Sequence, residues 1–271
     1  IASKHKEGRV YLALNGYRWD NFDALVYVSE NYGQTWKQLG LDLPQEPVNV
    51  IKEDPENENL LYIGTDHGVY ISLDRGDNFM LMNKNMPAVA VHDLIVHPRD
   101  KELIVATHGR SMFIANVADI QQLTSEFQAK KLHLFTIEEM TRRNSWGSSY
   151  AKWTEVNLPK KTIRFYAKDA NAKTKIRIKM GDLVLNEFET QTSKGLNYFD
   201  YDLTFDASKT SYYQAGLNKK KKEGEKDIII KEGDNKKFYL EAGEYQVEIQ
   251  QGSEVLTEKF VVKAPRARAK R

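Results

Sequence analysis

The sequence contains no cysteine in its 271 residues. This absence excludes a disulfide framework, thiolate metal sites and a cysteine nucleophile, although it leaves the cellular compartment open. No apolar run of about 18 residues is present, so the sequence predicts no transmembrane helix. No apolar stretch follows Lys4, Lys6 and Arg9 either, so the first residues are not a signal peptide.

A dominant charge of one sign is also missing. The chain has 40 Lys and Arg against 38 Asp and Glu, a net charge of +2, which argues against a broad nucleic-acid or membrane surface. The charge is nevertheless unevenly divided. Residues 1–123 hold 11 Lys and Arg against 17 Asp and Glu, and the remainder holds 29 against 21. This split indicates two separate bodies, and 41% apolar residues suffice to give each its own core.

A repeat dominates the first half. Residues 26–29 recur as 69–72 and, in weaker form, as 112–115, at steps of 43 residues. Each copy follows another short run of β-branched and aromatic residues, and Gly, Pro, Asn and Asp separate the runs, as in strands joined by hairpins. A period near 43 with about four strands per unit predicts an all-β fold built from β-propeller blades.

The turn after the repeated strand has its own signature. It reads Ser-x-Asp/Asn-x-Gly-x-x-aromatic twice, in Ser29, Asn31, Gly33 and Trp36 and in Ser72, Asp74, Gly76 and Phe79. The Asp or Asn can accept hydrogen bonds from turn amides, glycine allows a positive φ, and the aromatic residue anchors the next strand. This pattern resembles the Asp-box, or BNR, repeat of sialidase-like and sortilin-like propellers. The resemblance implies a structural turn on the face opposite the ligand site, so its carboxylate is not read as catalytic.

The blades are incomplete. We expect residues 1–118 to form about two and a half blades: the first lacks its first strand, the second (48–82) is complete, and the third lacks its fourth. Propellers usually close with four to eight blades. We therefore expect this to be the last part of a longer propeller, whose missing N-terminal blades belong to the same protein and supply the absent strand.

The second half predicts a different body. For residues 119–154 we expect one short helix over 119–128, begun by a capping box at Asp119, followed by a surface linker. Alternating strands over 155–264, about seven in number, favour an immunoglobulin-like β-sandwich, with Tyr245 placed for a tyrosine corner. The lysine run 219–222 reads as a hairpin tip. It and the basic tail 265–271 are either solvated or touch phosphate or lipid headgroups.

Loops opposite the repeated turns form the expected ligand face. Its candidate residues are Tyr17, Arg18, Trp19, Phe22, His67, His108 and Arg110. Aromatic rings with a few polar groups suit a sugar or a peptide. The alternative is that Trp19 and Phe22 only pack their loop onto the rim.

Catalytic and metal sites are weaker predictions. Asp20, Asp23 and Asp66 share the expected ligand face and are weak candidates for a glycosidase pair, but nothing singles out two of them, and no catalytic residue is assigned. The four histidines between 67 and 108 are better read as structural than as a metal site, since His92 and His97 would point to opposite faces of one strand unless a bulge intervenes. No cofactor is expected, and the sequence has no glycine-rich phosphate loop. It also has no serine nucleophile elbow.

The wider resemblance covers most of the chain. Residues 48–55, 64–70, 91–99 and 106–110 are similar to the closing blades of large bacterial BNR-repeat proteins, described as sortilin-like or glycosyl hydrolase-like, and 194–203 and 241–245 are similar to their C-terminal module. The resemblance implies a secreted, periplasmic or outer-surface protein of a Gram-negative bacterium. It also implies a binding or scaffolding function directed at a protein or glycan of the cell envelope. The balanced charge predicts no nucleic-acid partner. The alternative is a glycoside hydrolase of the sialidase-like or xyloglucanase-like propeller type, whose catalytic residues lie partly outside this segment.

Overall fold

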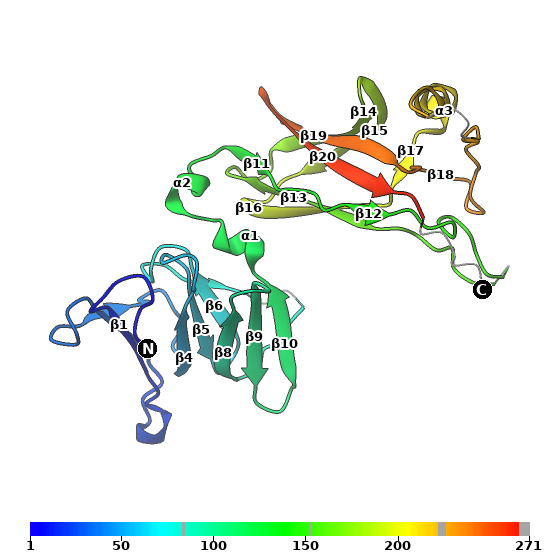
Figure 1. The fold of residues 1–271 in the computed structure, drawn as a ribbon. Coiled ribbons are helices and arrows are strands. Elements are labelled where there is room, and N and C mark those ends of the chain that lie inside the picture. The colour runs from blue at the N-terminus through cyan, green and yellow to red at the C-terminus, as the bar shows by residue number, and fades with distance from the viewer. Residues whose placement is uncertain (83–84, 152, 222–225, 266–271) are drawn as a thin grey trace. The chain divides into compact units, whose positions relative to one another are not determined.

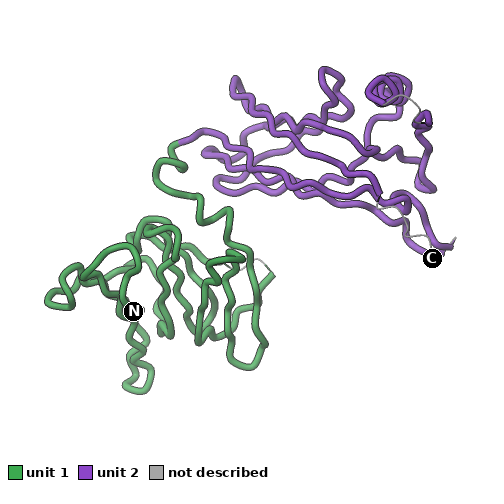
Figure 2. Tube along the Cα trace, viewed as in Figure 1, with its two compact units in different colours: residues 1–129 green, residues 130–271 purple. Residues whose placement is uncertain are grey.

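The computed structural model describes residues 1–82, 85–151, 153–221 and 226–265. The chain divides into two compact units, Ile1–Ala129 and Lys130–Arg271 (Figure 2). Each unit builds its own core from short strands, and helices are few (Figure 1). The predicted all-β fold is therefore confirmed.

The first unit contains three antiparallel sheets in chain order, which we call blades 1, 2 and 3. Their strands are β1 (Val10–Leu14), β2 (Leu25–Ser29) and β3 (Lys37–Leu39) in blade 1; β4 (Val48–Glu53), β5 (Leu61–Thr65), β6 (Val69–Ser72) and β7 (Met80–Leu81) in blade 2; and β8 (Val91–His97), β9 (Glu102–Thr107) and β10 (Met112–Asn116) in blade 3. Within the described residues, blade 2 alone has four strands, which matches the strand pattern expected from the repeat.

The blades repeat down to their irregularities. A bulge at Asn49 in β4 has its counterpart at His92 in β8, and the residues after the bulges pair as Val50 with Gly64 and as Asp93 with Ala106. These bulges fix the structural equivalence of blades 2 and 3, in which Ile71 corresponds to Ile114. A bulge bends its strand and redirects a side chain, which here happens at the same end of both blades.

Apolar side chains bind neighbouring blades together. Tyr11, Val26 and Leu39 of blade 1 pack against Ile51 and Ile63 of blade 2 in one core cluster. The opposite face of blade 2 packs against blade 3 in a second cluster. Both faces of β5 are buried, and its successive residues belong alternately to the two clusters. This alternation arises because neighbouring side chains of a strand point to opposite faces.

The exit from blade 3 differs from the prediction. Instead of one helix over 119–128 there are two short helices, α1 (Ala118–Gln121) and α2 (Ser125–Gln128). Asp119 begins no capping box: Val117 stands at the N-cap of α1 without a side-chain bond, and Thr124 caps α2 by accepting from the Phe127 amide. The side chain of Gln121 instead donates to the buried carboxylate of Asp54, which fastens α1 to blade 2.

The second unit is a sandwich of two sheets. One sheet has the order β11-β13-β16 and the other β12-β20-β19-β14-β15, and a separate pair joins β17 to β18. The strands are β11 (Leu132–Leu134), β12 (Met140–Thr141), β13 (Lys161–Ala167), β14 (Lys173–Met180), β15 (Leu183–Gln191), β16 (Gly195–Tyr201), β17 (Thr204–Phe205), β18 (Phe238–Tyr239), β19 (Gly243–Gln251) and β20 (Glu254–Lys263). Inward residues such as Ile163 and Phe165 of β13 share one core cluster with Ile176 and Ile178 of β14.

Two sequence-based expectations fail in this unit. The segment expected to be a surface linker supplies β11 and β12, and it buries Leu132, Leu134 and Trp146 in the sandwich core. The lysine run is not a hairpin tip, since Lys219 ends helix α3 (Thr210–Lys219). Tyr213 and Leu217 lie one helical turn apart and anchor that helix in the core. Lys222 and the tail 266–271 lie outside the described residues.

The predicted tyrosine corner is present. The Tyr245 hydroxyl donates to the Glu241 carbonyl oxygen at 2.7 Å, four residues upstream, and also bonds to the Tyr213 hydroxyl. Burial, followed by the interaction with the neighbouring Tyr213 hydroxyl, raises the pKa of Tyr245 far above its usual value. The corner thus ties β19 to helix α3 through uncharged phenols.

Candidate functional site

One end of the first unit carries the turns that the sequence assigned to ligand binding. It consists of the β1–β2 loop (15–24), the β5–β6 turn (66–68), the β9–β10 turn (108–111) and the blade 1–blade 2 connection (40–47), which we call together the loop face. In antiparallel blades these turns share one end because the strand direction alternates.

Aromatic side chains project from the β1–β2 loop. The loop contains a short 3-10 helix, η1 (Tyr17–Trp19), closed by amides that donate to the Gly16 and Tyr17 carbonyls. Trp19 is 79% exposed, and Tyr17 and Phe22 are about half exposed. Arg18 lies over the ring of Tyr17 and donates to its hydroxyl. The described part of the unit therefore does not use Trp19 to pack the loop onto the rim.

A chain of polar side chains fastens this loop to blade 2. The Asn15 amide donates to the Asn49 side-chain oxygen, and the Asn49 amide donates to Asp66 at 2.9 Å. A separate bond runs from the Gln45 amide to Asp23 at 3.2 Å. The bulge at Asn49 places that side chain between the two turns, and the result is a loop held at its base with its aromatic residues outside.

A buried carboxylate lies beneath the β5–β6 turn. Glu46 is only 5% exposed, and its Oε2 lies 2.6 Å from Nδ1 of the exposed His67. Since an ionised carboxylate only accepts, Nδ1 carries a proton and, in the neutral ring, Nε2 is left as an acceptor. Burial, then the hydrogen bond and charge of Glu46, raises the pKa of Tyr70 to about 12. An imidazole ring that a buried carboxylate holds in one orientation can bind a hydroxyl group or accept a proton.

Blade 3 contributes a pair of histidines. The bulge at His92 brings its ring to a centroid distance of 5.4 Å from that of His108, whose amide donates to the Ala90 carbonyl. His97 lies at the far end of β8 and pairs with Asp100 at 3.3 Å. Arg110 is exposed in the turn beside His108. Among the described residues no group of three or more His, Asp or Glu side chains is arranged to hold a metal ion.

The three candidate carboxylates take different roles. Asp66 accepts from Asn49 and Asp23 accepts from Gln45, so both help to hold the β1–β2 loop. Asp20 ends η1 in the left-handed region with φ 54° and is exposed. The structure therefore brings Asp66 and His67 to one turn and leaves Asp20 and Asp23 on the neighbouring loop.

The repeated turns have the hydrogen bonds expected of them. Asn31 Oδ1 accepts from the Thr35 amide at 2.9 Å, and Asp74 Oδ1 accepts from the Asn78 amide at the same distance. Ser29 and Ser72 each accept from the glycine amide, and Gly33 and Gly76 have φ of 85° and 91°. Burial acts to raise the pKa of Asp74, but the hydrogen bonds it accepts outweigh burial and lower it. These carboxyl and amide groups are occupied by the turns themselves.

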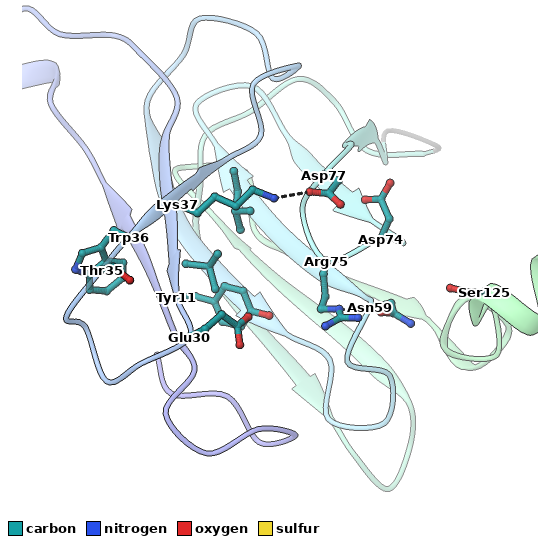
Figure 3. Close-up of a pocket in the computed structure, with 12 residues that line it drawn as sticks. Tyr11, Glu30, Thr35, Trp36, Lys37, Asn59, Asp74, Arg75, Asp77 and Ser125 are labelled. Carbon is teal, nitrogen blue, oxygen red and sulfur yellow. Dashed lines mark hydrogen bonds and ion pairs between the residues drawn. The ribbon is translucent and has the colours of Figure 1, made fainter.

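A cavity of about 440 Å³ opens between blades 1 and 2 at the opposite end (Figure 3). Lys37 reaches across it to Asp77 at 2.9 Å, and Arg75 on the blade 2 wall donates to Asn59. The Trp36 ring lies away from the Lys37 side chain (Figure 3). The other charged groups of the cavity also have partners: Glu30 pairs with Lys6 and Arg9, and Asp74 accepts hydrogen bonds within its own turn. The loop face is therefore the better candidate site.

Sequence reasoning missed Glu46, Asn49 and Tyr70. Glu46 lies in a connection with prolines on either side, where a charged residue is normally solvated, and nothing local predicts its burial. The position of Asn49 beside the start of a strand suggests a role in the site. The bulge that directs its side chain, however, depends on the pairing of β4 with β5. In the sequence, Tyr70 is a member of the strand repeat and nothing beside it predicts its contact with Glu46.

Solved structures that match this chain do so over only part of their own length. The extracellular domain of a putative one-component system from B. thetaiotaomicron matches 98% of this chain and 30% of its own, with 11% identity and a TM-score of 0.32. An ancestral GH74 enzyme matches 96% of this chain and 30% of its own (15% identity, TM-score 0.35), and the GH74 xyloglucanase from Xanthomonas campestris matches 93% and 36% (12% identity, TM-score 0.31). The chain thus spans about a third of the length of these proteins.

None of the curated proteins matches this chain. A family model does match it over residues 24–238, which include blades 2 and 3 and most of the sandwich, and that family is described as sortilin, neurotensin receptor 3. The match covers well over half of the chain. The chain therefore belongs to the Sortilin-Vps10 family.

Proposed function

We propose that this protein is a recognition or scaffolding protein that binds a protein or glycan of the cell envelope through the loop face of its propeller blades. We further propose that it acts outside the cytoplasm, in a secreted, periplasmic or outer-surface setting of a Gram-negative bacterium. None of the described helices is long and apolar enough to cross a membrane.

The carrying observation is the β1–β2 loop. Its base is fixed by the hydrogen-bond chain from Asn15 through Asn49 to Asp66, while Trp19 stays 79% exposed. A pre-organised loop loses little conformational entropy on binding, and exposed tryptophan and tyrosine supply most of the energy in recognition surfaces. His67 and Arg110 add polar groups with which a ligand can be oriented.

The test compares two exposed tryptophans in the full chain. Binding to a panel of soluble oligosaccharides is measured by calorimetry, and protein partners are captured with a photo-crosslinking residue at position 19 or 153. Trp19→Ala should weaken binding at least about tenfold, as expected for loss of an aromatic anchor, whereas Trp153→Ala should not. Equal affinity of Trp19→Ala and the wild type, or crosslinking only at position 153, would contradict the proposal.

The second candidate function is a glycoside hydrolase of the sialidase-like or xyloglucanase-like propeller type. The observation that favours it is the oriented pair of Glu46 and His67 beside Asp66. Turnover of the same oligosaccharides should then fall at least about a hundredfold in Glu46→Gln or Asp66→Asn. Binding without turnover in the wild type would favour recognition instead.

We also propose that further blades of the same protein cover the two end faces of the blade stack. Leu12 of blade 1 corresponds to Ile63 of blade 2, and Ile114 of blade 3 corresponds to Ile71; the blade 2 members are buried and their counterparts are exposed. The intact mass of the protein from its natural source tests this. A mass of 31.3 kDa, that of this chain alone, would refute it.

For the second unit we propose an immunoglobulin-like module. The sheet orders β11-β13-β16 and β12-β20-β19-β14-β15, together with the Tyr245 corner, support this assignment. Such a module would act as a spacer or as a second recognition surface.

A further inference from the structure

The only Asn-Gly step in the sequence lies at the base of the β1–β2 loop. Asn15 comes directly after β1, and Gly16 is the residue that precedes η1, with φ −99° and ψ 4°. The main-chain nitrogen of the next residue can attack an asparagine side chain, and glycine hinders that attack least because it has no Cβ. Asn15 is therefore the asparagine of this chain whose neighbour best permits loss of the side-chain amide.

The local hydrogen bonds favour the same attack. The Tyr17 amide donates to Asn15 Oδ1 at 3.1 Å, which closes a turn around Gly16. A donor at that oxygen draws electron density from Cγ and stabilises the negative charge that the oxygen gains when a nucleophile adds. The attacking group is the Gly16 nitrogen, and its N–H donates to no acceptor within the described ranges of the chain.

Asn21 provides a comparison within the same loop. Its Oδ1 accepts from the Asp23 amide at 2.9 Å, so it forms a turn of the same kind as Asn15 does. The residue after it is Phe22, whose side chain crowds the nitrogen that would have to attack. Both asparagines thus have a polarised side-chain carbonyl, and only Asn15 has glycine next to it.

The amide at risk is the one that fastens the loop to blade 2. Asn15 Nδ2 donates to Asn49 Oδ1 at 2.5 Å, and the Asn49 amide donates to Asp66 at 2.9 Å. A carboxylate at position 15 has no hydrogen to donate, so it would place one acceptor against another. It would also add a negative charge close to Asp66. Loss of the Asn15 amide therefore breaks the hydrogen-bond chain at its first link.

We propose that Asn15 deamidates spontaneously in the folded protein and that this change releases the β1–β2 loop from blade 2. The Gly16 nitrogen loses its proton and bonds to Asn15 Cγ, while Nδ2 takes up a proton and leaves as ammonia, which closes a succinimide ring. Water then adds to one of the two ring carbonyls and the bond from that carbon to nitrogen breaks, which gives aspartate or isoaspartate. The sum is asparagine plus water to the acid plus ammonia, so no further reactant is needed.

The first test follows both asparagines in the full chain over time. The protein is kept in neutral and in mildly alkaline buffer, and samples are digested with trypsin and analysed by mass spectrometry, with a sample digested at once as background. Cleavage after Arg9 and Arg18 places Asn15 and Asn21 in separate peptides. We expect the Asn15 peptide to gain the mass of an amide-to-acid conversion, faster at the higher pH, while Asn21 keeps its amide. Retention of the amide by Asn15 for as long as by Asn21 would overturn the proposal.

The second test asks whether the loop is released. Arg18 lies within η1, so trypsin can cut after it in the native protein only when the loop opens. The deamidated protein, separated by ion exchange, and Asn15→Asp should both be cut there at least about fivefold faster than fresh wild type, the effect of one lost hydrogen bond on the population of the open loop.

Asn21→Asp is the matched control for this second test. It adds the same charge to the same loop but keeps the oxygen that accepts from the Asp23 amide, so it should be cut at the wild-type rate. If Asn15→Asp were cut no faster than Asn21→Asp, release of the loop would be wrong. Neither test uses a ligand, so both outcomes are independent of the recognition function proposed for the loop face.

Discussion

Blades 2 and 3 of this protein share their strand register and their bulge, yet they differ in what covers them. Ile71 of blade 2 is 7% exposed because blade 3 lies against it, whereas the equivalent Ile114 of blade 3 is 64% exposed. The apolar pattern of the strands is the same in both blades, and it is a pattern that suits burial on both faces. The difference teaches that the stability of one blade depends on its neighbours, as in other repeat architectures.

The largest expected effect tests that dependence directly. Ile71→Ala should lower the free energy of unfolding of the first unit by about 3 kcal/mol, because it leaves a cavity between two blades, whereas Ile114→Ala should cost about 0.5 kcal/mol or less. Urea unfolding of both variants, followed by circular dichroism, measures the difference. Similar losses for the two would show that the Ile114 face is covered in solution.

The next contrast lies at the end of the first strand of each blade. Asp54 is fully buried and accepts from the amides of Glu56 and Asn57, from Tyr62 and from Gln121, whereas the equivalent His97 is half-buried. Asp54→Ala should cost about 2 kcal/mol, since it leaves buried donors without an acceptor. His97→Ala should cost much less in the same unfolding experiment, and equal costs would contradict the structural role given to Asp54.

The two repeated turns allow a finer comparison. Asp74→Ala and Asn31→Ala should each cost about 1 kcal/mol, as the loss of a capping side chain does. The pKa of Asp74 is lowered in the folded protein, so its ionic contribution is present above the ordinary value of 3.8 and is lost as the pH falls below it. The stability difference between wild type and Asp74→Asn should therefore shrink in acid. Asn31 cannot titrate, so a pH-dependent effect of Asn31→Ala would contradict this reading.

The smallest expected effects concern ion pairs between blades. Lys37 pairs with Asp77 between blades 1 and 2, and Lys101 pairs with Glu56 between blades 2 and 3, both at 2.9 Å and both exposed. Lys37→Ala and Lys101→Ala should each change the free energy of unfolding by less than about 0.5 kcal/mol, because solvent screens such pairs. Added salt should abolish even that change, and a larger, salt-resistant loss at either position would mean that the pair is buried by something further.

Most of the fold could be predicted from the alternating apolar pattern of the strands. The repeat of 43 residues and its turn signature sufficed for the blades, because a two-residue alternation and a glycine turn act locally. The same reasoning failed for residues 130–154. There β11 and β12 are only three and two residues long, and their pairing with β13 and β20 depends on residues far along the chain. Helix α3 also differs from the prediction, because the charge of the lysine run at its end favours a solvated hairpin when it is considered alone.

The candidate site, like the fold, could be predicted from the sequence only in part. The sequence by itself determined the chemistry of the loop face, since Tyr17, Trp19, Phe22, His67 and His108 fall in turns that alternation assigns to one end of the blades. Only the tertiary structure decided that Glu46 is buried against His67, that Asn49 links Asn15 to Asp66, and that Trp19 is left in solvent. The reason is physical: a turn follows from nearby residues, whereas burial and side-chain partners follow from which blade lies next to which.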